Sequence, residues 1–258
     1  MKAPRLRRGP FRADQLRDGD PYELSGGHPI LVLPSGGRGS DAAATGAAVV
    51  KSDPLVQAAG VDTGYSPEPG TLRAPDIAVG NVPREPGWVQ GCPPLAIEYA
   101  DTGQDERELA QKIRDLLAAG TRHVWVVRLT GPRRVDVHEP DREMRVAQPG
   151  EQLLAPGILA NPVPVEALYD WEVGREVTLR NLLQRHGYEN LEAVRSEAAV
   201  EGELEALRGA ILEVLAARGL PPTNDLRAAI AACRDPDQLR QWLRLTATAS
   251  SADVCLPP

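Results

Sequence analysis

The feature that most constrains the fold is a strand, a helix and a second strand that follow one another directly. The apolar run Leu95–Tyr99 is followed by Asp105–Ala119, where leucine and isoleucine recur at helical spacing, and then by the valine-rich run His123–Leu129. A connection of this kind joins two parallel strands, because the helix carries the chain back to the edge of the sheet where the first strand began. The sequence therefore predicts an α/β fold with at least one parallel strand pair.

Further strand-like runs on both sides of this unit make the predicted sheet a mixed one. Ser25-Gly26-Gly27-His28 indicates a hairpin turn between two apolar stretches near the start of the chain. An alanine-rich helix is expected at Asp41–Ala59, with an interruption at Asp53-Pro54. The remaining strands are expected at Tyr22–Leu24, Pro29–Leu33, Ile77–Val79, Arg134–His138, Met144–Ala147 and Glu151–Leu154.

After Pro164 the pattern becomes entirely helical, with breaks near Gly187, Gly202, Pro221 and Pro236. One apolar stripe in this part needs a partner surface, in the same chain or in a second copy, and consists of Leu204, Leu207, Ile211, Val214 and Leu215. We therefore expect a basic N-terminal leader at 1–20, a sheet-containing domain at 21–170, an all-helical C-terminal extension at 171–247 and a loose tail at 248–258.

Charge and composition exclude several classes of protein. A net charge of −7 argues against coating nucleic acid through a positive field, although it leaves room for a local basic groove. No run approaches the roughly 20 apolar residues that span a bilayer, and no apolar segment follows the basic start, so we expect a cytoplasmic protein without membrane contact. Cys92, Cys233 and Cys255 have no CxxC spacing, and the histidines have no ligand spacing. Any metal ion should then be held by oxygen.

Two acids and one lysine are placed where they can meet. Glu98 lies inside the apolar run Leu95–Tyr99, where an ionised carboxylate is costly unless it is paired or bound to a metal. Asp76 follows a proline at the entrance to the preceding strand. About 10 Å of strand follows Glu98, and about 10 Å of returning helix precedes Lys112, so the two side chains can reach the same level. Converging carboxylates and a cation suit a hard divalent ion that acts on a phosphodiester.

Each of these residues also has a plain structural interpretation. Asp76 after proline fits a turn or helix cap, and Glu98 fits the outward face of an edge strand. Lys112 fits a solvated helix position, and Glu23 fits an ordinary surface position. The register of Asp76 with Glu98 favours the site interpretation for these two acids. Both interpretations stay open for Lys112, and the surface interpretation is favoured for Glu23.

The same residues resemble a known family. The likeness extends to about Asp170, and Tyr22-Glu23-Leu24 is similar to the family's early acidic position. The resemblance is to the Uma-type restriction endonucleases of the PD-(D/E)XK nuclease superfamily, and it implies a restriction-endonuclease-like mixed sheet flanked by helices. The segments that carry it, in order, are Leu72–Val79, Pro93–Glu98, Glu108–Lys112 and Ala118–Val127.

The resemblance also implies an activity, namely Mg²⁺-dependent hydrolysis of phosphodiester bonds in DNA, with Mn²⁺ as a substitute. Asp76 and Glu98 would bind the metal, Lys112 would lie near the attacking water or the scissile phosphate, and Glu23 would be a supporting acid. The family's lysine lies on the helix after the strand, not two places after the glutamate, where this chain has Ala100.

Two further expectations concern partners and a rival function. Restriction-like nucleases cut two strands with two copies, so by analogy we expect a homodimer, formed through the helical extension. The alternative is a catalytically inactive nuclease-fold protein that serves as an oligomerisation or regulatory module. The acidic net charge favours this alternative, and the retained Lys112 favours the enzyme.

Overall fold

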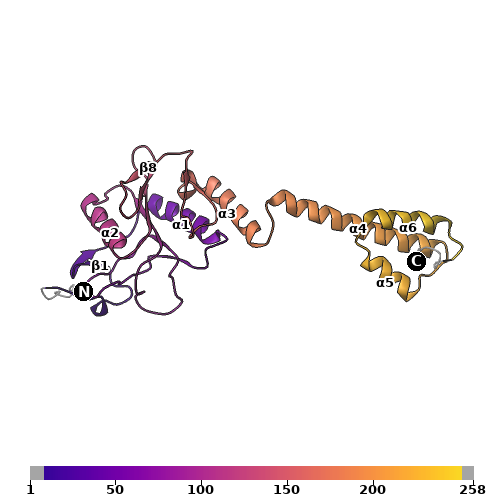
Figure 1. The fold of residues 1–258 in the computed structure, drawn as a ribbon, viewed down its shortest axis with the longest axis horizontal. Coiled ribbons are helices and arrows are strands. Elements are labelled where there is room, and N and C mark those ends of the chain that lie inside the picture. The colour runs from indigo at the N-terminus through magenta and orange to yellow at the C-terminus, as the bar shows by residue number, and fades with distance from the viewer. Residues whose placement is uncertain (1–8, 252–258) are drawn as a thin grey trace. The chain divides into compact units, whose positions relative to one another are not determined.

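The structure, a computed structural model, describes residues 9–251 and divides into two compact units after Gly187 (Figure 1). The first unit contains a mixed sheet with helices, and the second is helical. Residues 1–8 of the predicted leader and 252–258 of the predicted tail lie outside the described residues. Within residues 9–251, no helix combines the length and the apolar character needed to cross a membrane.

A six-stranded mixed sheet with the order β3-β4-β5-β6-β7-β8 forms the centre of the first unit. β5 and β6 are parallel, whereas the other neighbouring pairs are antiparallel. Helix α2 (Glu106–Ala118) is the crossover between β5 and β6, which confirms the predicted parallel pair. The strands are β3 (Ala59–Val61), β4 (Ile77–Val79), β5 (Leu95–Ala100), β6 (His123–Arg128), β7 (Arg134–His138) and β8 (Arg145–Ala147).

The first helix and the strand after it differ from the prediction. Helix α1 spans Gly37–Ser52 and ends at Asp53, which has an extended ψ of 135°. A residue before proline is driven out of the helical region, so Pro54 ends the helix rather than bending it. The chain after Pro54 forms β3, which pairs with β4. This strand was not predicted, because the helix was expected to continue to Ala59.

Two small strand pairs lie outside the main sheet. The predicted hairpin is confirmed as β1 (Tyr22–Ser25) and β2 (His28–Leu31), joined at two glycines with positive φ. The run Glu151–Leu154 was expected at the edge of the main sheet, which is wrong. Its residues form β9 (Gln152–Leu153), which pairs with β10 (Val163–Pro164) in a separate sheet.

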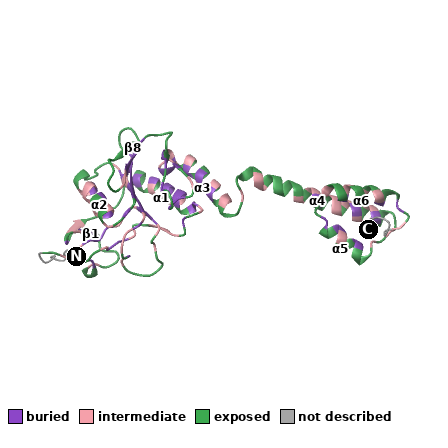
Figure 2. Ribbon diagram, in the orientation of Figure 1, coloured by how far each residue is buried: buried purple, intermediate pink, exposed green. Residues whose placement is uncertain are grey.

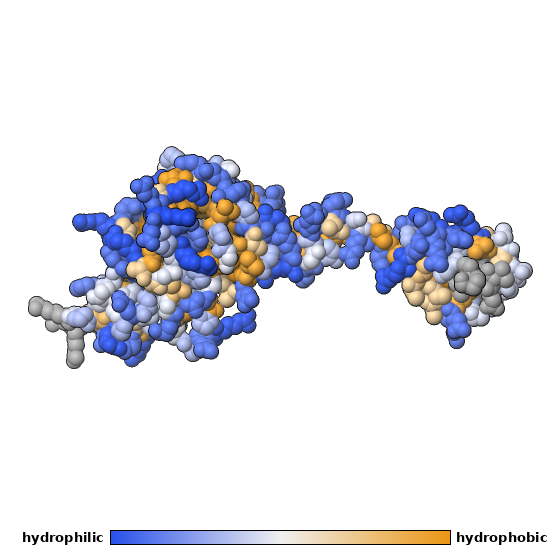
Figure 3. Space-filling view, viewed as in Figure 1, coloured by the Kyte–Doolittle hydropathy of each residue, from blue (hydrophilic) through white to orange (hydrophobic). Residues whose placement is uncertain are grey.

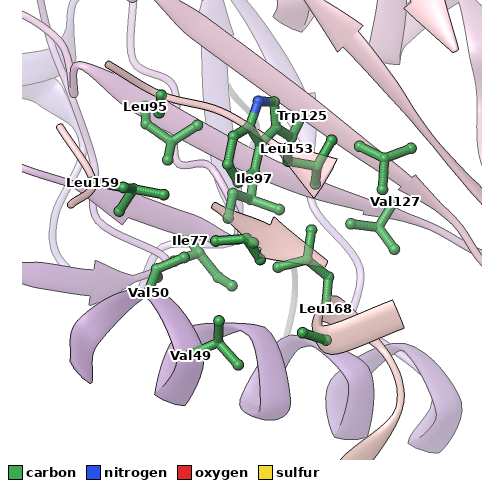
Figure 4. Packing of buried hydrophobic residues seen from close by; sticks show 14 of the residues in the cluster. Val49, Val50, Ile77, Leu95, Ile97, Trp125, Val127, Leu153, Leu159 and Leu168 are labelled. Atoms are coloured by element: carbon green, nitrogen blue, oxygen red, sulfur yellow. The ribbon is translucent and has the colours of Figure 1, made fainter. Parts of the chain in front are cut away.

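The two faces of the main sheet are covered by different helices. On one face, alternate strand residues pack with α1 and with η2 (Val165–Leu168), a short 3-10 helix (Figure 4). On the other face, alanines and valines of β5 and β6 pack against α2. The second set consists of Ala96, Ala100, Val124, Val126, Leu109, Ile113 and Leu116. Because side chains alternate along a strand, this division decides which polar residues face α2.

Helix α3 (Trp171–Arg185) lies in the first unit, although the sequence analysis grouped it with the C-terminal extension. Asn181 donates to Val49 O at 3.2 Å. Arg185 donates to Ser52 O at 2.8 Å and to Asp53 O at 2.6 Å. These bonds satisfy carbonyl groups at the C-terminal end of α1, where the helix supplies no further backbone donors; Val49 O also accepts from the Ser52 hydroxyl at 2.8 Å. Such long-range contacts cannot be read from helical periodicity.

The second unit consists of α4 (Leu191–Ala217), α5 (Asn224–Ala232) and α6 (Pro236–Thr248). The predicted break at Gly202 is wrong, since this glycine lies inside α4, where apolar packing on its C-terminal side holds the helix. Leu204, Ile211 and Leu215 of the predicted stripe are buried against α5 and α6. No residue in the first half of α4 is buried, as Figure 2 shows.

Candidate active site

Asp76 and Glu98 lie opposite each other on neighbouring strands. β4 and β5 pair Ile77 with Ile97, so one step along each strand places Asp76 across from Glu98. Ile97 and Tyr99 face the core on the α1 side, so alternation turns Glu98 toward α2. Glu98 is 5% exposed, and Asp76 is partly exposed. The pairing of the two strands thus brings together the two acids that the sequence analysis selected.

Lys112 reaches the same place from α2. This helix begins after Asp105, whose side chain accepts from two backbone N–H groups of the first turn, and its apolar residues pack on the sheet. Lys112 Nζ lies 3.0 Å from Glu98 Oε1 and 3.1 Å from Glu23 Oε1, and it donates to Ala74 O at 2.7 Å. All four residues selected from the sequence therefore lie in one cluster.

Glu23 is buried, although the plain interpretation placed it on the surface. Its residue is 5% exposed on β1, and its carboxylate lies between two cations, Lys112 and Arg73. Arg73, which is 1% exposed, also binds Glu108 and Asp115 on α2. The sequence analysis missed Arg73. Its position shortly before a predicted buried strand was the available signal, because an arginine buried there needs acidic partners.

Burial dominates the electrostatics of the cluster. It raises the pKa of Glu98 to about 8, against the attraction of Lys112. It also raises the pKa of Asp76, again opposed by Lys112. Burial alone would lower the pKa of Lys112, but the three surrounding acids outweigh burial and raise it. One ammonium group therefore faces three acids, an arrangement that favours an additional proton or cation.

A further acid, Asp62, extends the row of Asp76 and Glu98 to a third strand. β3 and β4 pair Val61 with Ile77, so Asp62 lies opposite Asp76, and its N–H donates to Asp76 O at 3.4 Å. Its φ of 51° is unfavourable for a residue with a side chain. Asp62 is exposed at the rim, and partial desolvation raises its pKa. It was missed because β3 was not predicted.

The residues present fit a hard divalent cation in part. Both oxygens of Glu98 lie close to Lys112 Nζ: Oε2 accepts a hydrogen bond at 3.1 Å, and Oε1, at 3.0 Å, is an ion-pair contact without hydrogen-bond geometry. Within residues 9–251, however, no three His, Cys, Asp or Glu side chains form a group arranged to hold a metal ion. Asp76 and Glu98 would supply two ligands, and water or a phosphate would supply the rest, which is the usual mode of Mg²⁺ binding.

Residues 11–164, more than half of the chain, match the Uma2 family, described as "Putative restriction endonuclease". The structure is similar to that of "a putative nuclease belonging to DUF820" from Anabaena variabilis ATCC 29413, with a TM-score of 0.54 and 20% sequence identity, covering 62% of this chain and 98% of that chain. No curated protein matches the chain. The structural likeness shows the nuclease-like fold, and the family match supports a nuclease function. The matched residues include Glu23, Asp76, Glu98 and Lys112. The chain that holds this cluster therefore belongs to the Uma2 family.

Proposed function

We propose that this protein is a Mg²⁺-dependent endonuclease of the PD-(D/E)XK kind that hydrolyses phosphodiester bonds in DNA. The observation that carries the proposal is the position of Lys112, whose Nζ lies 3.0 Å from Glu98 Oε1, beside the opposed pair of Asp76 and Glu98. Carboxylates from two strands and a cation from a helix meet the needs of phosphodiester chemistry. The family's description supports the same class of activity.

Asp76 and Glu98 are the proposed ligands. When bound, the metal would lower the pKa of a water molecule and offset negative charge on the phosphate. The N–H of Tyr99 donates to Asp76 Oδ2 at 2.6 Å, which holds that carboxylate in place and leaves its other oxygen available. Glu98 would offer Oε1, which accepts no hydrogen bond but which a cation would share with the ammonium of Lys112, 3.0 Å away.

Lys112 acts as a fixed positive charge in this proposal, not as a base. The surrounding acids raise its pKa, so it stays protonated at neutral pH and cannot take a proton from water. Its role is then to stabilise negative charge on the scissile phosphate. Glu23 holds the ammonium from the other side, at 3.1 Å, and so fixes its direction.

DNA binding should depend strongly on the cation. A net charge of −7 works against long-range attraction to the DNA backbone. We infer that the scissile phosphate is held chiefly through the metal and Lys112, and that the affinity for DNA in the presence of a chelator is low.

Plasmid nicking tests the proposal. Purified protein should convert supercoiled plasmid to the open circle with Mg²⁺ or Mn²⁺ and not with a chelator. Asp76→Asn and Glu98→Gln should remove the activity, whereas Glu172→Gln, a change to an exposed residue of α3, should leave it unchanged. Nicking by either site variant at the wild-type rate would refute the assignment. No nicking by wild type, together with no calorimetric heat on adding Mn²⁺, would favour the catalytically inactive alternative.

We also propose that two copies associate through the helical extension. The first half of α4 exposes Leu191 and Val200, at 41% and 49%, and Figure 3 shows apolar patches among hydrophilic ones in this region. Val200 also lines a shallow groove of about 550 Å³ with Leu204 and Arg234. Sedimentation velocity should show a dimer that Leu191→Glu with Val200→Glu makes monomeric. A wild-type protein that is monomeric at all concentrations would contradict this.

A further inference from the structure

Lys112 has two acidic neighbours on its own helix that it does not bind. Glu108 precedes it by four residues and Asp115 follows it by three, so both lie on its side of α2. A glutamate four residues before a lysine is the favoured order for an ion pair within a helix. On local grounds, Lys112 would pair with Glu108 rather than reach toward Glu98 in the sheet.

Arg73 occupies both of these acids. It donates from Nη1 to Glu108 Oε1 at 2.7 Å and from Nε to Asp115 Oδ2 at 2.8 Å. Nη1 also donates to Glu23 Oε2 at 3.0 Å, and Glu23 Oε1 lies 3.1 Å from Lys112 Nζ. Glu23 therefore links the two cations, while the acids of α2 are already bound by the guanidinium.

We propose that Arg73 is a positioning residue that decides which acid Lys112 binds. By neutralising Glu108 and Asp115, it removes the competing partners on α2. Through Glu23, it also fixes one side of the place where the ammonium lies. Lys112 is left to bind Glu98. The value of this placement for catalysis rests on the proposed nuclease function, but the placement itself does not.

The chemistry of the side chain explains why an arginine holds this position. A guanidinium presents five N–H donors in a rigid plane and can serve three carboxylates in different directions, which one ammonium does less well. Arg73 is 1% exposed and is the cation that Glu108 and Asp115 share, although the Glu108 side chain, at 33% exposed, also meets water. Without it, Glu108 and Asp115 lose their cation, and Lys112 lies four residues after Glu108 and three before Asp115, the spacings at which side chains of one helix meet.

Lysine labelling measures the placement without any need for activity. The chain has three lysines, Lys2, Lys51 and Lys112, and Lys51 is exposed on α1, so it serves as an internal reference. The full-length protein is treated with a limiting amine-reactive reagent, and modification of each lysine is followed by mass spectrometry. In Arg73→Met, Lys112 should leave the buried Glu98 for Glu108, whose side chain is 33% exposed, and its labelling rate relative to that of Lys51 should rise about tenfold, the factor for one charge-assisted hydrogen bond exchanged for contact with water.

A rescue variant separates positioning from general stability. Arg73→Met combined with Glu108→Gln and Asp115→Asn removes the competing acids, so the labelling ratio should return toward the wild-type value. Arg114→Met, a change to an exposed arginine of the same helix, should leave the ratio unchanged. A folded Arg73→Met protein with the wild-type ratio would overturn the proposal, as would a triple variant labelled as fast as Arg73→Met.

Two further arms keep the test decisive. If Arg73→Met does not fold by circular dichroism, Arg73→Lys takes its place and should label faster than wild type, whereas a wild-type ratio there overturns the proposal. Plasmid nicking should fall in the Arg73 variant and recover in part in the triple variant. If wild type does not nick, the proposed function fails, while the labelling ratios still decide whether Arg73 places Lys112.

Discussion

The backbone N–H of Tyr99 donates to Asp76 Oδ2 at 2.6 Å, so the residue directly after Glu98 fixes the carboxylate opposite it. The two acids are therefore held together by the backbone of β5 as well as by the pairing of the strands. Their mutual repulsion and their burial are offset by Lys112. Burying these acids beside each other lowers the free energy of unfolding. The size of this effect should depend on pH and on added cations.

Glu98→Gln should change how stability depends on pH. The folded protein holds the proton of Glu98 up to a pKa of about 8, whereas the unfolded chain releases it near the ordinary value of 4.5. Between these values the folded state binds more protons, so the free energy of unfolding should fall as the pH rises. Glutamine has no proton to lose, and the fall from pH 5 to pH 8 should become smaller.

Urea unfolding at several pH values measures this effect, and Glu172→Gln is the matched control. Glu172 is exposed on α3, so its replacement should leave the slope of stability against pH unchanged. A Glu98→Gln protein with the wild-type slope would mean that Glu98 is ionised in the folded state at all these pH values.

Metal binding should release protons at neutral pH. A cation binds the ionised carboxylate, so it must displace the proton that burial keeps on Glu98 below its pKa of about 8. Calorimetry with Mn²⁺ at pH 7, in two buffers of different ionisation enthalpy, should show release of up to about one proton per ion. At pH 9 the release should be much smaller. Heats that do not depend on the buffer at pH 7 would argue against Glu98 as a ligand.

The sequence predicted those parts of the site that depend on local pattern. The crossover at β5, α2 and β6 was readable from periodicity, and it places Lys112 at the level of Glu98. Asp62 was not found, because its strand has only three residues and follows a helix whose end was placed too late. Arg73 was not found, because its partners come from β1 and α2, and no periodicity reports contacts between separate elements.

Gly174→Ala should destabilise the first unit. A Cβ at this position would lie 2.5 Å from Thr45 Cγ2 and 3.0 Å from Ala167 O, because α3 approaches α1 and η2 closely there. Overpacking of this kind costs about 1–3 kcal/mol. Gly39→Ala in α1 is the control, since its Cβ would meet no atom nearer than 3.9 Å, and it should be neutral or stabilising by up to about 1 kcal/mol. Denaturant melts of both variants measure the difference, and equal midpoints would contradict the packing.

Shortening the chain should show that α3 completes the first unit. A protein that ends at Gly187 keeps Asn181 and Arg185, whose bonds satisfy the carbonyl groups at the end of α1, and its first-unit unfolding transition should be retained. A protein that ends at Asp170, the boundary expected from helical pattern alone, loses the hydrogen bonds that α3 donates to these carbonyl groups, at about 1–3 kcal/mol for each group left buried without a partner.

The shorter protein also exposes the apolar surface that Val177 covers, so it should unfold at clearly lower denaturant or fail to fold. Arg185→Met in the full chain isolates the hydrogen-bond contribution, and Arg175→Met, at an exposed surface pair on the same helix, is its control. If the proteins ending at Asp170 and at Gly187 unfolded at the same denaturant concentration, α3 would add nothing to the stability of the first unit. The carbonyl groups of α1 would then be satisfied by water.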